Sequence, residues 1–481
     1  MNNHQKSGKL AENLLWKYLE RISAQIVSMV VTIILARLLD PSHYGQVAMV
    51  MIFITIANVF VSDGFGSALI QKENVDALDF FSVLYFNIGF SLLLYLFIYS
   101  IAPYISSFYG EGYETMTPVL RVLGFRIILT AINSVQQAYI AKKMIFKKFF
   151  IATLTGTIIS AFVGIWMAYL GYGVWALVAQ YLTNTTVDTV FLYFSIGIKP
   201  KLIFSIDRLK RLVPFGTKIL SVNLLITLFE EFKSLLIGKI YSSQDLGFFE
   251  KGKQFPNIII NNISATLSSV LFPKMANDQY DKKLVKSTMK ISIRNSSFLL
   301  CPMMVGLAAV SKSFVEIVLT EKWLPCVPIL RAFCVAYMFM PIHSVNMQAV
   351  KALGEGKIFF MIELVKKIIE LVVLLISIRY GVFEVAIGVA ICNTIFVFIN
   401  AYPNGKLLNY GIFEQFTDIM PGLVMSIIMG FVVFSIGFIP LDKRVLLIIQ
   451  IIIGVTVYIL LSLITKNKEL ISLLGALKKY S

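Results

Sequence analysis

The stretch Pro118-Val119-Leu120-Arg121 recurs 210 residues further along the chain as Pro328-Ile329-Leu330-Arg331. At the same offset, Ser134-Val135 matches Ser344-Val345. Further matches keep this order at offsets of 208 and 202: Tyr172-Gly173-Val174 with Tyr380-Gly381-Val382, and Gly45 with Gly247. Because the matches preserve both order and spacing, they indicate two tandem copies of one structural unit.

The composition places these copies in a membrane. Hydrophobic residues make up 57% of the 481 residues, charged residues only 15%, and the mean hydropathy is +0.79. A soluble fold cannot bury so much apolar surface with so little charge, which excludes soluble enzymes, nucleic-acid-binding proteins and secreted scaffolds. A membrane-spanning helix needs about 20 apolar residues. About fourteen such runs follow one another, at 15–39, 44–66, 79–102, 118–141, 149–170, 173–195, 213–238, 247–272, 290–311, 324–348, 357–379, 382–402, 414–438 and 443–464. Twelve spans are the alternative count.

The repeat and the spans together predict the architecture. Each copy contains six spans, and since six is an even number, both copies have the same orientation across the membrane. The expected fold is an all-α polytopic membrane protein, with two parallel six-helix lobes around a central cavity and two C-terminal helices. The lobes are predicted at 1–205 and 206–410, and the two additional helices with a cytoplasmic tail at 411–481.

The positive charges predict the orientation. The net charge is +16, and Lys and Arg concentrate in links on the same side as the termini, such as 142–148 and 199–211. Because cytoplasmic links of membrane proteins carry an excess of Lys and Arg, we expect both termini in the cytoplasm. The charge therefore does not indicate a nucleic-acid partner. The four cysteines have no metal-site or disulfide spacing, so we expect neither a metal nor another cofactor.

Several apolar runs carry polar side chains three and four residues apart, which places them on one face of a helix. Such a face cannot contact lipid at low cost, so it contacts water or another helix. In the first, seventh and eighth spans we expect it to line the cavity, through Lys17, Gln25, Ser28, Asn223, Thr227, Gln254, Asn257 and Asn261. The alternative is that these side chains only join helices through interhelical hydrogen bonds.

Charged residues within or near the apolar runs are the stronger indication of function, because a central Arg or Lys costs about 2.5–3.5 kcal/mol on insertion. Some charges are expected to pair along one helix: in the eleventh span, Glu363 with Lys367 and Lys366 with Glu370, each four residues apart. Arg21 and Arg126 have no acidic residue on their own stripe. We therefore expect these two arginines to contact an anion.

Short motifs in the chain resemble those of a known family. Two of them are Leu38-Leu39-Asp40-Pro41-Ser42-His43-Tyr44-Gly45 and Ser62-Asp63-Gly64-Phe65-Gly66-Ser67-Ala68-Leu69-Ile70-Gln71. The run from Gln136 to Lys147 and the stretch Leu246-Gly247-Phe248-Phe249 are similar to the same family. Over essentially its whole length the chain resembles the Wzx-type polysaccharide flippases. Their superfamily, the multidrug/oligosaccharidyl-lipid/polysaccharide exporters, also holds the MATE drug exporters and the peptidoglycan-precursor flippases such as MurJ.

This resemblance implies transport of an undecaprenyl-pyrophosphate-linked oligosaccharide, for O-antigen or exopolysaccharide, from the cytoplasmic to the outer leaflet by ion-coupled alternating access. It implies a bacterial cytoplasmic (inner) membrane location, contact with membrane lipids, and a polysaccharide polymerase and a chain-length regulator as partners. On this basis the cations expected at the pyrophosphate are Arg21, Arg126, Lys251 and Lys253. The acids expected to couple the ion are Glu230, Glu231, Asp63 and Asp188.

Four alternatives stay open. One is a lipid scramblase with no substrate specificity, which the sequence does not separate from the main prediction. A peptidoglycan lipid II flippase requires the same chemistry, and the sequence does not separate it from the main prediction. A MATE-type multidrug antiporter moves cations and needs an acidic cavity, whereas the stripes and their neighbours hold more Lys and Arg than Asp and Glu. A glycan polymerase or ligase needs a sizeable outward loop with acid or base residues, and the outward links predicted here are short. We therefore expect a membrane transporter and not an enzyme.

Overall fold

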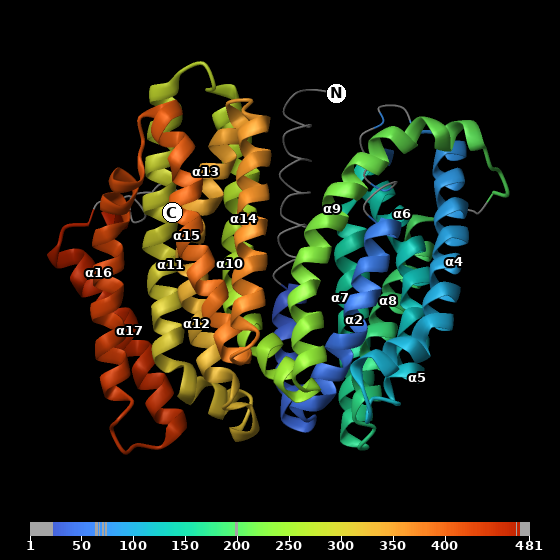
Figure 1. Cartoon of the computed structure of the whole chain (residues 1–481), viewed down its shortest axis with the longest axis horizontal. Helices are drawn as coiled ribbons and strands as arrows, with labels where there is room; N and C mark the ends of the chain where they lie inside the picture. Colours follow the sequence, from blue (N-terminus) through green and yellow to red (C-terminus); the bar gives the residue numbers. More distant parts are fainter. Residues whose placement is uncertain are drawn as a thin grey trace. The chain divides into compact units, whose positions relative to one another are not determined.

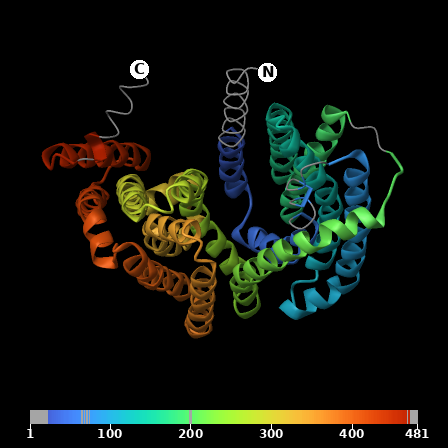
Figure 2. The same cartoon turned by 90° about the horizontal axis from the view of Figure 1, so that it is seen from above.

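The computed structural model describes residues 23–62, 66, 68–69, 72, 75–197, 201–467 and 469–471, and in these residues the regular secondary structure is entirely helical (Figure 1). The chain divides into two compact units, Met1–Gly247 and Phe248–Ser481, called unit 1 and unit 2 below. Seen from above, many helices of each unit appear nearly end on, as in a helical bundle (Figure 2). The expected all-α fold is therefore confirmed.

The described part of unit 1 begins with a helix over Ser23–Leu38. It continues with α2 (Pro41–Ser62), α4 (Ala77–Tyr109), α5 (Met116–Gly124), α6 (Arg126–Lys143), α7 (Phe146–Tyr169), α8 (Val174–Ile196) and α9 (Ile206–Ile240). Helix α10 (Ser243–Asn277) starts in unit 1 and leads into unit 2. Unit 2 continues with α11 (Lys282–Val318), the short 3₁₀ helix η1 (Glu321–Trp323), α12 (Cys326–Met338), α13 (Met340–Ala352), α14 (Gly356–Ser377), α15 (Val382–Leu408), α16 (Ile412–Ile436) and α17 (Lys443–Ile464).

The internal repeat is visible in how the helices pack. In unit 1, α4 packs on α5 and α6, and both α6 and α7 pack on α8. In unit 2, α11 packs on α12 and α13, and both α13 and α14 pack on α15 in the same way. The fourth and tenth predicted spans are each divided into two successive helices, α5–α6 and α12–α13. Repeat-related glycines, Gly173 and Gly381, precede α8 and α15 and have φ values of 54° and 154°. Helices α16 and α17 pack on α11 and lie outside the repeat.

A second pair of repeat-related glycines brings two backbones together at the starts of α2 and α10. A Cβ on Gly45 would lie 1.5 Å from the Ser243 carbonyl oxygen. A Cβ on Gly247 would lie 2.2 Å from the carbonyl oxygen of Pro41, the residue related to Ser243 by the same offset. Both distances are far too short for any side chain. The match between Gly45 and Gly247 is therefore a reciprocal backbone contact, which only residues without a Cβ allow.

Aspartates fix several helix starts. The Asp76 carboxylate accepts the Asp79 backbone N–H at 2.8 Å and so caps α4. This hydrogen bond and the nearby Arg208 guanidinium, 3.1 Å away, hold the pKa of Asp76 below its usual range. Asp281 and Asp442 cap α11 and α17 in the same manner. A carboxylate at a helix N-terminus also interacts favourably with the helix dipole. These three aspartates therefore determine where the helices begin.

Contacts between links test the predicted alternation of the spans. In unit 1, Arg208 pairs with Asp76, and Lys148 donates to the Ser195 carbonyl oxygen at 2.5 Å, so the links around these residues share one end. At the opposite end, the Ser243 backbone N–H donates to the Tyr113 hydroxyl at 3.0 Å. Links predicted on the same side of the membrane therefore meet, and links predicted on opposite sides do not meet in the contacts described for this unit.

In the described part of the chain, ten helical segments are long and apolar enough to cross a membrane, with α5–α6 and α12–α13 each counted as one. The bent helix α9 is an eleventh if its two parts count as one span. The other predicted spans coincide with the short helix Ser23–Leu38 and with α8 and α14. Helix α8 carries a polar run, and α14 carries several charges. The structure is consistent with fourteen spans, and that number stays a prediction.

The boundary between the units differs from the predicted lobe boundary. Helix α9 packs on α2 and α4 and therefore belongs to unit 1, whereas the sequence places it in the second lobe, which is predicted to begin at 206. The predicted boundary follows the repeat, in which α9 is equivalent to the first helix. The division into units follows the contacts between helices instead. The predicted boundary therefore describes the sequence repeat, and the observed boundary describes the packing.

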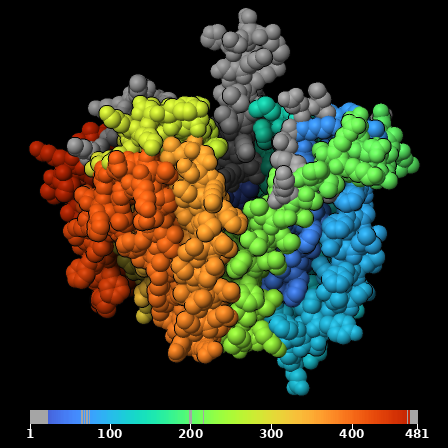
Figure 3. Space-filling model, turned by 45° about the horizontal axis from the view of Figure 1, so that its top comes forward, coloured from blue at the N-terminus to red at the C-terminus, as the bar shows by residue number. Residues whose placement is uncertain are grey.

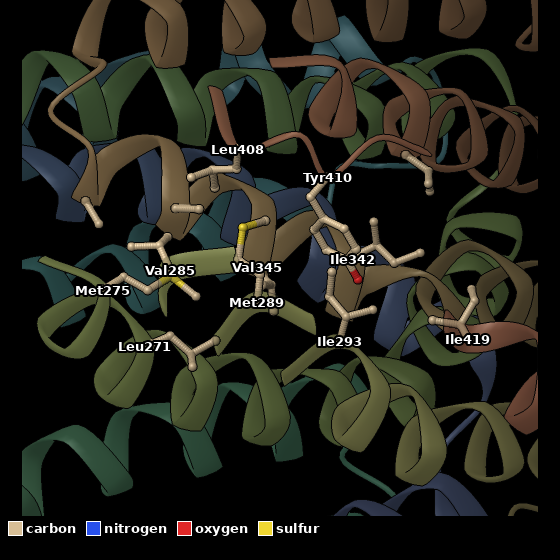
Figure 4. Packing of buried hydrophobic residues seen from close by; sticks show 13 residues of the cluster. Leu271, Met275, Val285, Met289, Ile293, Ile342, Val345, Leu408, Tyr410 and Ile419 are labelled. Atoms are coloured by element: carbon tan, nitrogen blue, oxygen red, sulfur yellow. The ribbon is translucent and has the colours of Figure 1, made fainter. Parts of the chain in front are cut away.

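An apolar core lies in unit 2, where α10, α11, α13, α15 and α16 converge. Met275 and Leu271 on α10 contact Val285, Met289 and Ile293 on α11 (Figure 4). Side chains from α13, α15, α16 and the link between α15 and α16 complete the cluster, among them Ile342, Val345, Val397, Leu408, Tyr410 and Ile419. Met275, Met289, Ile342 and Val345 are fully buried. Burial of this size holds the helices of unit 2 in one arrangement.

Candidate functional site

The first candidate site lies where α6 meets α8 in unit 1. Arg126 is the first residue of α6, directly after the break at Phe125. Its Nε donates to the Thr185 hydroxyl at 2.9 Å, and its guanidinium carbon lies 5.4 Å from the centroid of the Tyr181 ring. Its Nη1 lies 3.8 Å from the Met51 sulfur. Among the described residues the guanidinium has no carboxylate partner, so its charge is oriented but not neutralised.

Asp188 lies one helical turn beyond Thr185 on the same helix. Its Oδ2 accepts a hydrogen bond from the Asn133 side-chain amide at 3.0 Å, and Gln137 donates to Asn133 Oδ1 at 2.5 Å. The other oxygen, Oδ1, is buried and has no hydrogen-bond partner among the described groups. A buried oxygen without a partner is costly, so it is a natural position for a proton or a cation. We call Arg126, Asn133, Gln137, Thr185 and Asp188 the α6–α8 polar cluster.

The α6–α8 polar cluster depends on local sequence. Thr183 to Thr189 form a polar run in the middle of an otherwise apolar helix. Gly156 on α7 lets α8 approach closely, because a Cβ there would lie 3.1 Å from the Asn184 carbonyl oxygen. The sequence analysis identified Arg126 and Asp188 but missed Thr185 and Tyr181. The polar run could have identified Thr185, since it stands out among apolar neighbours, whereas Tyr181 lies outside this run.

The predicted residues of the first and seventh spans are only partly described. Lys17, Arg21 and Asp63 lie outside the described residues. On the helix Ser23–Leu38, Gln25 is half-buried and Ser28 is exposed. On α9, three of the predicted side chains are half-buried and one is exposed: Asn223, Thr227 and Glu231 belong to the first group, and Glu230 to the second. Because these four residues are spaced mostly by three or four positions, they lie on one side of α9, as the sequence predicts.

The predicted residues of α10 divide into two groups in unit 2. Lys251 is 4% exposed, donates to Gln254 Oε1 at 3.0 Å and lies 5.7 Å from the centroid of the Trp323 ring. It packs where α10 meets η1 and α12, with Gly252 directly against Ile329. Lys253, Gln254 and Asn257 are half-buried, and Asn261 is exposed. These residues share one helix and leave several polar side chains accessible.

The further part of the α10 stripe joins helices, which is the alternative that the sequence left open. The Gln348 side chain on α13 donates to the Ser268 hydroxyl at 3.0 Å, and the Ser344 and Ser264 hydroxyls are 3.5 Å apart. Both interactions connect α10 with α13. The α10 stripe therefore contributes to packing near its C-terminal end, and only its N-terminal part remains a candidate for lining a cavity.

Unit 2 contains a polar cluster that the sequence analysis did not identify. Asn346 on α13, Asn404 on α15 and Gln415 on α16 are fully buried, and each side-chain amide nitrogen donates to two oxygens. The shortest of these hydrogen bonds, Asn346 to Gln415 and Asn404 to Asn346, are both 2.7 Å. We call these three residues the amide cluster. One turn away, Asn400 lies 2.8 Å from the ring nitrogen Nδ1 of His343.

The charges on α14 pair along the helix as expected, but the ion pairs described join residues three apart and not the predicted partners four apart. Lys366 forms an ion pair with Glu363 at 2.6 Å, and Lys367 forms one with Glu370 at 3.0 Å. All four side chains lie on one face of the helix. Charges that neutralise each other along one helix reduce the cost of placing them in a membrane.

Comparisons with known proteins identify the class of the chain. A family model described as polysaccharide biosynthesis protein matches residues 34–328. The succinoglycan biosynthesis transport protein ExoT of Rhizobium meliloti (strain 1021) is 22% identical over 97% of this chain and 95% of its own length. The teichuronic acid biosynthesis protein TuaB of Bacillus subtilis (strain 168) is 22% identical over 79% of each chain. The solved structure of the lipid II flippase MurJ in an inward closed conformation has a TM-score of 0.75 at 18% identity, covering 94% of this chain and 98% of that chain.

The likeness to MurJ concerns the fold, and it confirms the MurJ-like architecture that the sequence predicts. The family match covers more than half of the chain. The chain therefore belongs to the polysaccharide biosynthesis protein family, and it is a multi-pass membrane transport protein rather than an enzyme.

Proposed function

We propose that this chain is a flippase that moves an undecaprenyl-pyrophosphate-linked oligosaccharide from the cytoplasmic to the outer leaflet of the bacterial inner membrane. Family membership and the ExoT relative, whose name describes a polysaccharide transport protein, support a substrate of this kind. TuaB serves a different polysaccharide, so the relatives do not specify the sugars. The proposal places both termini in the cytoplasm, in keeping with the distribution of Lys and Arg.

The observation that carries this proposal is Arg126. A pyrophosphate and its sugars cannot cross hydrocarbon, so they need a polar path with cations along it. The Arg126 guanidinium is held in a span by Thr185 and Tyr181 and has no carboxylate partner among the described residues. An oriented, unneutralised guanidinium at this depth binds a phosphate group through charge-assisted hydrogen bonds. A transporter of cationic drugs, in contrast, gains nothing from it.

In this proposal the cations Arg21, Arg126, Lys251 and Lys253 contact the pyrophosphate at successive stages. The polar side chains on the first helix, α9 and α10 contact the sugars. The lobes at 1–205 and 206–410 alternate between inward-open and outward-open states. An ion gradient drives this cycle through acidic residues, for which Asp188 is the best supported of Glu230, Glu231, Asp63 and Asp188, since one of its oxygens is buried without a partner among the described groups.

Reconstitution tests the function directly. The full chain is incorporated into liposomes with an undecaprenyl-pyrophosphate-linked oligosaccharide, and a lectin that cannot cross the bilayer reports the sugars in the outer leaflet. We expect transfer that accelerates under a proton or sodium gradient. Protein that is folded, as thermal melting shows, and yet produces no transfer under any gradient contradicts the proposal.

Two further experiments separate the alternatives. Rescue of cells depleted of their own lipid II flippase, without transfer of the oligosaccharide lipid, favours a peptidoglycan precursor as the substrate. Resistance to cationic drugs without either activity favours a MATE-type antiporter. We also propose a polysaccharide polymerase and a chain-length regulator as partners. Co-purification of the full chain with each candidate from cells that make the polysaccharide tests this part.

A further inference from the structure

An apolar groove runs between α14 and α15 in unit 2. Its volume is about 800 Å³, and its wall consists almost entirely of hydrophobic side chains. Met361 and Val365 line it from α14, and Phe398 and Tyr402 line it from α15. These side chains are 40–64% exposed, which is high for such large apolar groups. The two helices lie on the face of unit 2 that Figure 3 shows in orange.

The groove lies on the side of α14 opposite to its charged face. Successive helical residues are rotated by about 100°, which places Met361 and Val365 on one side of the helix. The paired charges Glu363, Lys366, Lys367 and Glu370 lie about half a turn away. A helix with a charged face and an opposite, exposed apolar face turns the apolar face toward lipid. The groove is therefore open to the hydrocarbon of the bilayer and is not part of the predicted polar path.

Two lysines stand at one end of the groove. Lys357 belongs to the first turn of α14 and Lys406 to the last turn of α15, so both lie at the end predicted to be cytoplasmic. The Lys406 ammonium lies 4.8 Å from the centroid of the Tyr402 ring, which orients it along the groove. Within the described part of the chain, neither ammonium forms an ion pair with a carboxylate. This end of the groove thus carries two positive charges available to an anion.

We propose that the groove binds an anionic glycerophospholipid of the cytoplasmic leaflet, with an acyl chain along Met361, Val365 and Phe398 and the phosphate between Lys357 and Lys406. The match is one of shape and charge, since a lipid has an apolar chain below an anionic headgroup at the depth where the lysines lie. Basic pockets between helices on the cytoplasmic side bind anionic headgroups by this principle. The site goes beyond the proposed function, because it requires no particular transported substrate.

Titration of the purified full chain with phosphatidylglycerol tests the site. Lipid retention is measured by native mass spectrometry and by thermal melting, with phosphatidylcholine as the neutral comparison. We expect preferential binding of phosphatidylglycerol and a loss of about 30-fold in affinity in Lys357→Gln/Lys406→Gln, the factor expected for two lysines next to an anionic headgroup. Val365→Trp, which fills the groove, is expected to weaken binding while both lysines remain.

The matched control is Lys282→Gln/Lys283→Gln. It removes two exposed lysines at the start of α11, at the same predicted side but outside the groove, and we expect it to bind phosphatidylglycerol as the wild type does. Equal affinity of the wild type and Lys357→Gln/Lys406→Gln overturns the proposal. Displacement of phosphatidylglycerol from the wild type by low concentrations of undecaprenyl phosphate also overturns it, because the groove then belongs to an isoprenoid lipid.

Discussion

The α6–α8 contact of unit 1 and the α13–α15 contact of unit 2 occupy repeat-related positions, but their chemistry differs. Asn133 and His343 are equivalent at the offset of 210. In unit 1, the partner of Asn133 on α8 is Asp188, and Arg126 lies on the same pair of helices. In unit 2, the partner of His343 on α15 is Asn400, and the neighbouring residues form the neutral amide cluster.

This difference indicates a division of roles between the two copies. A neutral network in which each amide nitrogen donates to two oxygens stabilises one arrangement of helices. Among the described groups, a buried oxygen without a donor occurs in both units, at Asp188 Oδ1 and at Asn404 Oδ1. The difference is the charge, because a guanidinium without an opposite charge and a buried carboxylate are costly in a membrane unless they have a use. We therefore infer that the amide cluster holds unit 2 together and that the α6–α8 polar cluster of unit 1 takes part in transport.

The strongest test of this division is Arg126→Ala. We expect transfer of the oligosaccharide lipid to fall about 100-fold, because a charge-assisted hydrogen bond to phosphate is lost. Arg126→Lys keeps the positive charge but loses the planar guanidinium. We expect its transfer rate to lie between those of the wild type and Arg126→Ala. Transfer into the outer leaflet of liposomes is measured together with the melting temperature, which we expect to change little.

The matched control for this variant is Arg121→Ala. Arg121 belongs to the preceding helix, α5. It donates to the Tyr99 carbonyl oxygen at 3.2 Å and stacks on the Tyr99 ring. Its removal is therefore expected to leave transfer nearly unchanged. If Arg121→Ala and Arg126→Ala reduce transfer equally, the effect is one of folding or general charge, and Arg126 has no special role.

Asn346→Ala tests the other side of the comparison. Removal of this side chain leaves the buried amides of Asn404 and Gln415 each without one acceptor. We expect a loss of about 2 kcal/mol in the free energy of unfolding, or about 30-fold in the ratio of folded to unfolded protein. Denaturation in detergent measures it. Transfer by the folded fraction is expected to stay as in the wild type.

The control for Asn346→Ala is Asn393→Ala, because Asn393 is half-buried and donates only to the Val389 carbonyl oxygen of its own helix in the hydrogen bonds described. Its effect on stability is expected to be below about 0.5 kcal/mol. An Asn346→Ala protein that is fully stable but inactive contradicts the structural role of the amide cluster.

Asp188→Asn tests the carboxylate of unit 1. The amide keeps the hydrogen-bonding shape but cannot take up or release a proton, so we expect gradient-driven transfer to fall about tenfold. Transfer without a gradient is expected to change much less. The measurement compares liposomes with and without an imposed proton or sodium gradient. Full gradient dependence in Asp188→Asn excludes this residue as the coupling group.

Much of the fold was predictable because a membrane imposes simple rules. Apolar length predicted the spans, and the offsets of Gly45 and Gly173 predicted which helix starts are equivalent, as the reciprocal backbone contact and the two positive-φ caps now confirm. The membership of α9 in unit 1 was not predictable. The repeat assigns α9 to the second copy because it is equivalent to the first helix of the chain. Its packing on α2 and α4 depends on tertiary contacts, which a sequence repeat does not predict.

The sites were predictable only in part, for a similar reason. Arg126 and Asp188 stand out because charges in apolar runs are rare. The amide cluster escaped notice since Asn346, Asn404 and Gln415 come from three helices, and no single helix shows an unusual stripe. For Lys251 the sequence indicates only a charge near a polar stripe. Its side chain is buried beside the ring of Trp323, which lies some seventy residues away in the sequence. Its proposed contact with the pyrophosphate stays a prediction.

The smallest effect is expected from His343→Asn, which places in unit 2 the residue found at the equivalent position of unit 1. The ring is buried beside the Asn400 amide, and an asparagine keeps one hydrogen bond to that neighbour. We expect transfer to change by less than about twofold, or 0.5 kcal/mol, at any pH between about 6 and 8, where a histidine ordinarily titrates.

His343→Asn distinguishes the units because it removes a titratable group from unit 2, while Asp188→Asn removes one from unit 1. If Asp188 couples a proton, the dependence of transfer on pH disappears in Asp188→Asn and persists in His343→Asn. The opposite outcome assigns the coupling to unit 2 and reverses the division of roles. Asn133→His, the reciprocal change, replaces the amide that donates to Asp188 with an imidazole, whose positive charge when protonated favours the ionised carboxylate. We expect it to reduce gradient-driven transfer only if that carboxylate must change its protonation during the cycle.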